Sequence, residues 1–330
     1  MKLFIIPTAI SLVALIAIYL WGGISAFLIA CLLSILEVTL SFDNAVVNAK
    51  ILTRMSALWQ SRFLTWGILL AVFGTRLILP IVIVSIAAMI SPIKAAMLAL
   101  YSPEEYTELL QGAGPIIASF GGAFLLMVSL QYFFDVAKQV HWITVVERHL
   151  VRWGRIEAIE IALALLALLL LSYFSPISQG VILTAGIVGV ILFIVIQGVA
   201  NSLNIETKSV TRTGLILFLY LNVLDAAFSL DGVIGAFAIT TVIPVIFVGL
   251  GIGAYFVRSM TLYLVRKKTL ATLIYLEHGA HWAILGLALS MLFSLVIHIP
   301  EVVTGLIGLV FVSLAYISSR REFLRQTQNQ

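Results

Sequence analysis

The amino-acid sequence predicts an all-α, polytopic membrane protein whose roughly ten transmembrane helices form two inverted five-helix repeats. Three observations predict this fold class: an apolar composition, positive charges confined to alternate loops, and an acidic motif that occurs twice. Hydrophobic residues make up 62% of the 330 residues and charged residues 10%, whereas soluble domains carry about 25% charged residues. The net charge of +4 does not indicate nucleic-acid binding, because in a membrane protein the location of Lys and Arg matters more than their sum.

Runs of about 20 largely apolar residues, the length that crosses a bilayer, define the predicted spans in order. We interpret the first run as a retained span rather than a signal peptide, because only Lys2 precedes it and no small-residue cleavage site follows it. No polar stretch is long enough for a second domain. We therefore expect one transmembrane domain over residues 1–330, with half-repeats over 1–174 and 175–320 and a short polar tail over 321–330. The predicted spans lie near residues 4–20, 24–50, 63–90, 114–134, 157–174, 180–200, 213–239, 242–264, 274–297 and 302–319.

The distribution of positive charge supports ten spans with both termini in the cytoplasm. Sixteen of the nineteen Lys and Arg residues then fall on one side, only Lys94 falls on the other, and Arg76 and Arg258 lie inside spans. Because cytoplasmic loops are enriched in Lys and Arg, we expect a multi-pass protein of the plasma membrane. The sixteen residues are Lys2, Lys50, Arg54, Arg62, Lys138, Arg148, Arg152, Arg155, Lys208, Arg212, Arg266, Lys267, Lys268, Arg320, Arg321 and Arg325.

The cytoplasmic segment over residues 138–153 reads KQVHWITVVERHLVRW and mixes Trp, Val and Ile with basic residues. This mixture predicts a short helix that lies in the membrane interface. A plain positively charged loop is the alternative.

One acidic motif organises the chain, because it places carboxylates inside apolar runs. Residues 36–45 read LEVTLSFDNA and residues 224–233 read LDAAFSLDGV, so in each copy a Ser and an Asp follow the first acid at the same spacing. An ionised carboxylate at the bilayer centre costs at least about 2.5 kcal/mol. A bound cation is the simplest compensation for four such acids.

The two copies of the motif predict inverted repeats. They lie in the second and seventh predicted spans, which run in opposite directions because they are an odd number of spans apart. In the following spans, residues 67–76 (GILLAVFGTR) parallel residues 249–258 (GLGIGAYFVR). Inverted repeats with binding sites near the midplane are typical of secondary transporters. Because Ser-x-Asp-Asn and Ser-x-Asp-Gly are poor helix sequences, we expect a helix break after the serine of each copy.

The motif residues predict a site for a hard divalent cation, built entirely from oxygen ligands of the kind that suit Mn²⁺, Mg²⁺ or Ca²⁺. If all four acids are ionised, Arg76 and Arg258 neutralise half of their charge, and the remainder matches one divalent cation. A shared proton would neutralise an acid equally well. In the alternative interpretation, Asp43 and Asp231 form structural ion pairs with Arg76 or Arg258. In either interpretation, we expect the two arginines to have a structural or proton-coupling role. The predicted ligands are Glu37, Ser41, Asp43, Asn44, Asp225, Ser229 and Asp231.

Further polar residues lie near the ends of predicted spans. Glu277 and His281 are four residues apart and are candidates for a cytoplasmic access site or proton relay, or for a polar interfacial cap. Gln131 and Asp135 share a helix face and are candidates to line a vestibule, unless Asp135 only marks the end of its span. Other candidates to attract cations, or simply to be solvated, are Glu104, Glu105, Glu108, Glu301 and His298.

The motif residues resemble those of the TerC-type integral membrane protein family, within the LysE-like transporter superfamily. The resemblance rests on Glu37, Asp43, Asn44, Asp225 and Asp231, together with a glycine segment over residues 120–126 (FGGAFLL) that is similar to one in the family's third span. It covers residues 24–297 and implies a manganese(II) exporter or a tellurite-resistance-type protein.

We therefore expect a secondary transporter that moves a divalent cation, Mn²⁺ above all, outward through the carboxylate site. It would have no enzymatic activity and no prosthetic group, and its partners would be the lipid bilayer and the transported cation rather than nucleic acid. Whether it forms a homo-oligomer stays open. One alternative is a membrane organiser or assembly factor that does not transport. The least favoured alternative is an intramembrane aspartyl hydrolase, because a doubled acid in each of two symmetric copies fits that chemistry poorly.

Overall fold

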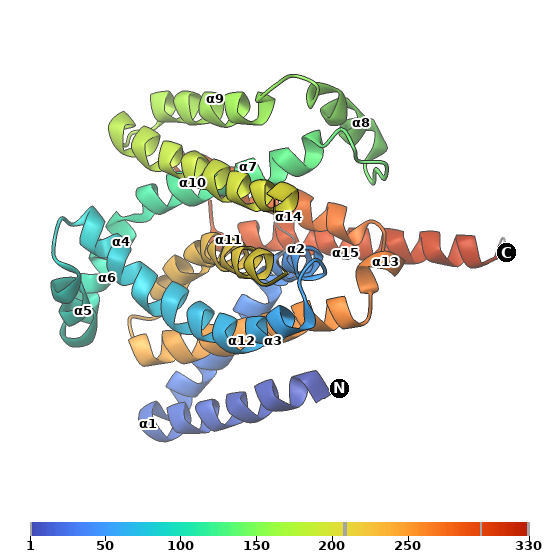
Figure 1. Ribbon diagram of the computed structural model, residues 1–330. Helices are drawn as coiled ribbons and strands as arrows, with labels where there is room; N and C mark the ends of the chain where they lie inside the picture. Colours follow the sequence, from blue (N-terminus) through green and yellow to red (C-terminus); the bar gives the residue numbers. More distant parts are fainter. Residues whose placement is uncertain (1, 207–209, 298, 329–330) are drawn as a thin grey trace. The chain divides into compact units, whose positions relative to one another are not determined.

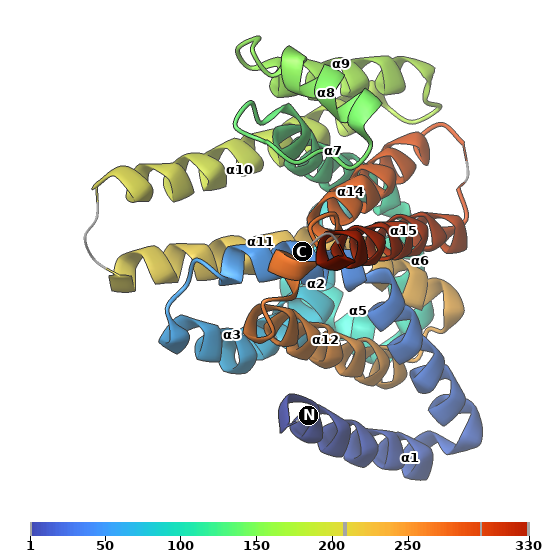
Figure 2. The same ribbon diagram turned by 90° about the vertical axis from the view of Figure 1, so that its right-hand side faces the viewer.

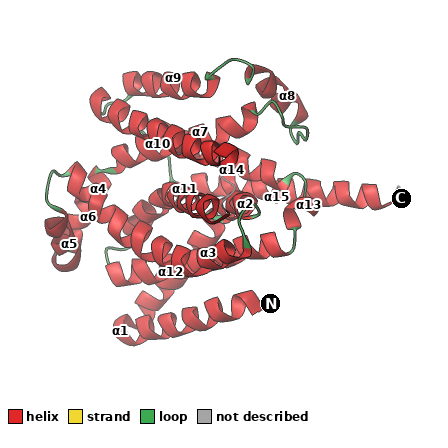
Figure 3. Ribbon diagram, in the orientation of Figure 1, coloured by secondary structure: helices red, strands yellow, loops and turns green. Residues whose placement is uncertain are grey.

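All regular secondary structure in the described part of the chain is helical. The computed structural model describes residues 2–206, 210–297 and 299–328, and within these ranges Figure 3 shows helices joined by loops, without a strand. The all-α class predicted from the sequence is therefore confirmed. Lys208 and His298, which were named above, lie outside the described residues.

Figure 1 labels the helices along the chain. They divide into two compact units, each of which contains segments from both halves of the sequence. The predicted half-repeats, 1–174 and 175–320, do not coincide with these units and remain predictions. The first unit covers residues 1–41, 55–114 and 208–263, with helices α1 (Lys2–Leu40), α3 (Ala57–Leu69), the π-helix η1 (Leu70–Ile78), α4 (Leu79–Ala87), α5 (Pro92–Tyr101), α6 (Pro103–Gly112), α11 (Val210–Ile239) and most of α12 (Ile243–Arg266). The second unit covers residues 42–54, 115–207 and 264–330, with α2 (Phe42–Leu52), α7 (Gly114–Phe134), α8 (Thr144–Trp153), α9 (Ile159–Phe174), α10 (Gln179–Glu206), α13 (Thr269–Thr272), α14 (Leu276–Phe293) and α15 (Glu301–Gln328).

Six helices in the described ranges are long and apolar enough to cross a membrane. Two shorter apolar helices, α5 and α9, accompany them. A chain with this many such helices is a multi-pass membrane protein, as the composition predicts. The six segments are Leu3–Leu40, Ala57–Ala87, Gly114–Phe134, Gln179–Val199, Gly214–Ile239 and Ile243–Arg266.

Helix α1 bends at Gly23, where the sequence predicts the boundary between the first two spans (Figure 2). The φ angle of Gly23 is +72°, a conformation that glycine adopts readily because it lacks a Cβ atom. The expected break after the serine of the first motif is also present. Helix α1 ends at Leu40, Ser41 forms a turn, and α2 begins at Phe42.

The second copy of the motif does not break the helix, so that prediction is wrong. Helix α11 runs without interruption through Ser229, Asp231 and Gly232. Gly232 faces another helix, since a Cβ atom at this position would lie 3.4 Å from the carboxylate of Glu37 on α1. Tertiary packing of this kind overrides weak helix propensity.

The predicted span near residues 63–90 forms one continuous path through α3, η1 and α4. Its middle section is a π-helix that contains Arg76. π-Helical segments are rare and occur frequently at functional sites. The side chains of Thr75 and Arg76 both donate to the backbone oxygen of Ala71, at 2.6 and 2.8 Å.

Two glycines spaced by four let α12 approach α1 closely in the first unit. A Cβ atom at Gly249 would lie 2.7 Å from Cβ of Leu33. The hydroxyl of Ser34 donates across the interface to the backbone oxygen of Gly249 at 3.0 Å. Gly253 lies against Glu37 in the same way. Small residues at this spacing are typical of closely packed membrane helices.

In the second unit, α14 and α15 lie side by side and both contact α2 (Figure 2). The rings of Trp282 and Phe311 stack between α14 and α15, with centroids 5.9 Å apart. A helix forms within the segment 138–153, as predicted, but it is shorter, because α8 begins only at Thr144. Its position in the membrane interface stays a prediction.

We predict that Gly189→Ala lowers the thermal unfolding temperature of the purified protein. A Cβ atom at Gly189 on α10 would overlap the backbone oxygen of Phe120 on α7, and overpacking costs about 1–3 kcal/mol. The matched control is Gly198→Ala on the same helix, where a Cβ atom would meet nothing within 4 Å. Equal unfolding temperatures of the two variants in a detergent thermal-shift assay would contradict this packing.

Candidate functional site

The first acid of each motif forms a buried ion pair with an arginine inside the first unit. Glu37 on α1 pairs with Arg76 on η1. Asp225 on α11 pairs with Arg258 on α12, with 2.7 Å between Nη2 and Oδ2. All four side chains are buried. Each of these two acids, which occupy the same position in the repeated motif, therefore pairs with the arginine of the span that follows it.

The surroundings of Glu37 are built from small residues. The hydroxyl of Ser41, one turn later, donates to Oε1 of Glu37 at 3.1 Å. Gly232 on α11 and Gly253 on α12 face Glu37, so glycines of two other helices make room for this carboxylate. The structure thus brings the first motif together with part of the second within the first unit.

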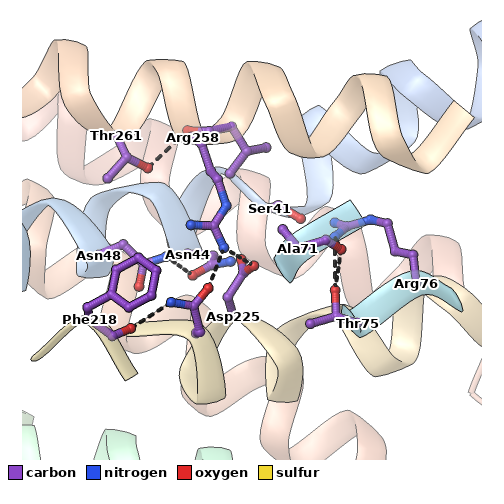
Figure 4. Close-up of polar contacts among 12 residues, drawn as sticks. Ser41, Asn44, Asn48, Ala71, Thr75, Arg76, Phe218, Asp225, Arg258 and Thr261 are labelled. Carbon is purple, nitrogen blue, oxygen red and sulfur yellow. Dashed lines mark hydrogen bonds and ion pairs between the residues drawn. The ribbon is translucent and has the colours of Figure 1, made fainter. Parts of the chain in front are cut away.

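Arg258 lies in a pocket of polar and aromatic side chains. Figure 4 shows its guanidinium pointing toward Asp225. Its carbon Cζ lies 4.4 Å from the centre of the Phe63 ring, a cation–π contact. The Nη2 group also donates to Oδ1 of Asn222 at 3.3 Å, and Asn222 donates to the backbone oxygen of Phe218 at 2.6 Å. Gly67 leaves the space that Nη1 of Arg258 occupies.

The second aspartate of each motif has no arginine partner among the described residues of its own unit. Asp231 on α11 is partly buried, and no salt bridge joins it to a described residue of its unit. Asp43 belongs to the second unit, where it is buried in the first turn of α2 and accepts a hydrogen bond from the backbone N–H of Asn44 at 2.9 Å. The alternative in which Asp231 pairs with Arg76 or Arg258 is not found in the first unit, where these arginines pair with Glu37 and Asp225. For Asp43, which belongs to the other unit, this alternative stays a prediction.

The remaining predicted ligands, Ser229 and Asn44, belong to different units. Ser229 is buried on α11. Asn44 on α2 accepts a hydrogen bond from the side chain of Asn48 at 2.7 Å. Among the described residues, no three His, Cys, Asp or Glu side chains lie together in a way that could hold a metal ion. The metal-ligand set therefore remains a prediction.

The predicted cytoplasmic access residues have definite partners in the second unit. Glu277 on α14 pairs with Lys50 on α2, with 2.8 Å between Oε2 and Nζ. His281 is buried and stacks on Tyr132 of α7, with ring centroids 3.6 Å apart. Its Nδ1 atom lies 2.8 Å from the backbone oxygen of Glu277, so it contacts the main chain of this residue and not its carboxylate.

The two candidate vestibule residues lie at the end of α7. Gln131 is half-buried on this helix, whereas Asp135 follows its last residue and is exposed. The carboxylate of Asp135 accepts the backbone N–H of Ala137 at 2.9 Å. Asp135 therefore forms an Asx turn directly after α7, which favours the interpretation that it marks the end of this span.

A buried polar cluster around Glu147 was missed by the sequence analysis. The side chain of Glu147 on α8 is fully buried. Its Oε2 atom lies 2.8 Å from Nδ1 of His278 and 3.1 Å from Nζ of Lys138, and Oε1 accepts the indole N–H of Trp282 at 3.1 Å. The nearest signal in the sequence is a single acid within the otherwise basic segment 138–153.

The hydrogen bonds around Glu147 change its acidity. Burial alone would raise the pKa, but the hydrogen bonds from His278 and Trp282 and the charges of His278 and Lys138 outweigh it, so that the pKa falls from 4.5 to about 2. Burial lowers the pKa of Lys138, whereas the charge of Glu147 acts in the opposite direction. Glu147 therefore remains a carboxylate at physiological pH, and it ties α8 to α14.

We predict that Glu147→Gln destabilises the protein at neutral pH and that this effect shrinks on acidification. A group whose pKa is lowered in the folded state stabilises that state above its unfolded pKa, and this stabilisation disappears as the pH falls from about 4.5 to about 2. Unfolding temperatures measured across this pH range check the prediction. Glu157→Gln, at an exposed glutamate nearby, is the control. A constant difference between Glu147→Gln and the parent protein at every pH would contradict the predicted linkage.

We also predict that Asp225→Asn destabilises the protein by about 3–5 kcal/mol, because it leaves the buried charge of Arg258 without its carboxylate. Asp225→Asn combined with Arg258→Met should recover much of this loss, since a buried ion pair can often be replaced by apolar side chains. Unfolding of both variants in detergent measures the effect, with the exposed Asp135→Asn as control. Additive losses in the double variant would show that the pair is not coupled.

Comparison with known families corrects the resemblance drawn from the motifs. The family described as "Protein of unknown function (DUF475)" matches residues 42–326. This is a different family from TerC, so the TerC-type assignment is wrong. The motif is a short pattern of acids and small residues, which is too little sequence to separate families that bury carboxylates in membranes. No curated protein matches the chain, and no solved structure matches it. Because the match covers most of the chain, the protein belongs to the DUF475 family of proteins of unknown function.

Proposed function

We propose that the protein is a secondary transporter of a divalent metal cation, most specifically an exporter of Mn²⁺. The observation that carries this proposal is that only two of the four motif acids form an ion pair with a described arginine of their own unit. Arginines neutralise Glu37 and Asp225, whereas no ion pair joins Asp43 or Asp231 to a described residue of its own unit. A carboxylate inside a membrane protein is costly without a compensating charge, so a proton or a metal cation is needed at each of these aspartates.

The charges of the motif acids favour a divalent cation that exchanges with protons. The two arginine pairs cancel, and the two remaining carboxylates carry the charge that one divalent cation or two protons would neutralise. Exchange of one for the other would leave the charge of the buried acids unchanged. Backbone, carboxylate and amide oxygens are hard ligands, which favour Mn²⁺, Mg²⁺ or Ca²⁺ over softer metals.

The proposal includes the finer topology expected from the sequence. Ten spans in two inverted repeats, cytoplasmic termini and a plasma-membrane location would place both motifs near the midplane, where secondary transporters bind their substrates. The repeated pairing of acid and arginine supports this interpretation, because both copies make the same contact. The chain carries no phosphate-binding loop of the P-loop type, which favours transport driven by an ion gradient.

The test is the metal content of manganese-stressed cells, measured by mass spectrometry, with the protein or its variants present at matched membrane levels. We expect the parent protein to lower cellular manganese selectively. Asp43→Asn and Asp231→Asn should each abolish this effect, because an amide cannot supply the negative charge that a metal or a proton neutralises. The control is Glu105→Gln, which changes an exposed carboxylate outside the motifs and should transport like the parent.

Two outcomes would contradict transport. If no metal changes in cells that express the parent protein, it does not export the metals measured. If the aspartate variants lower manganese as the parent does, the carboxylates do not carry the cation. A membrane organiser or assembly factor predicts tolerance of both variants and is favoured by that second outcome.

A further inference from the structure

Helix α8 contacts the rest of the second unit near both of its ends. Its inner side carries Glu147, whose carboxylate accepts bonds from α14 and also from the backbone N–H groups of Trp142 and Ile143, at 3.2 and 3.3 Å. After the helix, Gly154 lies so close to the backbone oxygen of Phe134 that a Cβ atom would overlap it. The segment therefore returns to the end of α7, where it began (Figure 1).

The outer side of α8 is exposed in the described part of its unit. Val145 is 76% exposed and Trp153 is 53% exposed. Arg148 and Arg152 on the helix, and Arg155 in the turn that follows it, are exposed as well. These residues define the outer face of α8, which is the surface considered below.

The outer face of α8 separates apolar from basic residues along the helix. At 100° per residue, Val145, Val146 and Trp153 occupy one flank together with His149, and Arg148 and Arg152 occupy the neighbouring flank beside Val145, with Glu147 on the buried side. Arg155 lies in the turn after the helix and adds to the basic charge. A helix with this division rests at a membrane surface, where the apolar flank enters the boundary with the acyl chains and the basic flank faces the headgroups.

We propose that the outer face of α8 binds the headgroups of anionic phospholipids at the surface of the membrane. Three features favour a lipid over a protein partner. No ion pair joins the three arginines to a described acid of their unit. The apolar flank ends in a tryptophan of the kind enriched at bilayer surfaces, and the segment joins the ends of two apolar helices, α7 and α9. Lys138, the remaining cation of the segment, points inward to Glu147, so the arginines alone supply the outward charge.

The experiment uses the full chain in lipid nanodiscs with an environment-sensitive fluorophore on α8. Cys31 is the single cysteine, so Cys31→Ser with Val145→Cys directs the label to the outer face. We expect the label to shift to an apolar spectrum when phosphatidylglycerol is added to phosphatidylcholine. Arg152→Gln should raise the phosphatidylglycerol content needed for half the response about fivefold, since each cationic side chain near an anionic surface contributes about that factor.

Two sets of variants make the result specific to charge on α8. Arg148→Gln, Arg152→Gln and Arg155→Gln together should remove the response, whereas Lys at the same three positions should retain it. Arg320→Gln with Arg321→Gln, at exposed positions of α15, should leave the response of the α8 label unchanged. Added salt should weaken the response, because the headgroup contact is electrostatic.

Each opposing outcome overturns the proposal. An identical spectrum with and without phosphatidylglycerol would show that the face does not recognise anionic lipid. A response that survives the triple glutamine variant would show that the arginines do not carry it. A response that requires protein extracted from native membranes, and not lipid alone, would assign the face to a protein partner.

Discussion

The cost of a carboxylate inside a membrane is the constraint on which this structure depends. In the first unit, two acids from distant parts of the chain are each compensated by an arginine from the next apolar helix. Removing either partner would leave an uncompensated buried charge, which is more costly than the pair itself contributes. The relative arrangement of α1, η1, α11 and α12 is therefore linked to charge as well as to apolar packing.

Glycines make these charge pairs sterically feasible. Gly253 and Gly232 leave room for Glu37, and Gly67 leaves room for the guanidinium of Arg258. Between membrane helices the hydrophobic effect contributes little, so close contact of small residues supplies much of the association. The same glycines that let helices approach closely also bring the charged groups within bonding distance.

The second unit contains a buried polar cluster near the ends of its helices. Glu147 collects a lysine, a histidine and an indole N–H around one buried carboxylate. This cluster attaches a short amphipathic helix to α14 and leaves the basic side of that helix exposed. Charge thus has two roles in the chain: compensation among apolar helices in one unit, and attachment of a surface helix in the other.

Composition, periodic apolar runs and the repeated motif were sufficient to predict an all-α multi-pass protein, a boundary between helical segments near residues 20–24 and the break at Ser41, because these follow from local hydropathy and backbone preference. The motif also identified the four acids, but not their partners. Only the tertiary structure decided that Arg76 and Arg258 neutralise Glu37 and Asp225, that α11 continues through Asp231, and that Glu147 is buried. These features depend on side chains from helices far apart in the sequence, whose distances no local pattern encodes.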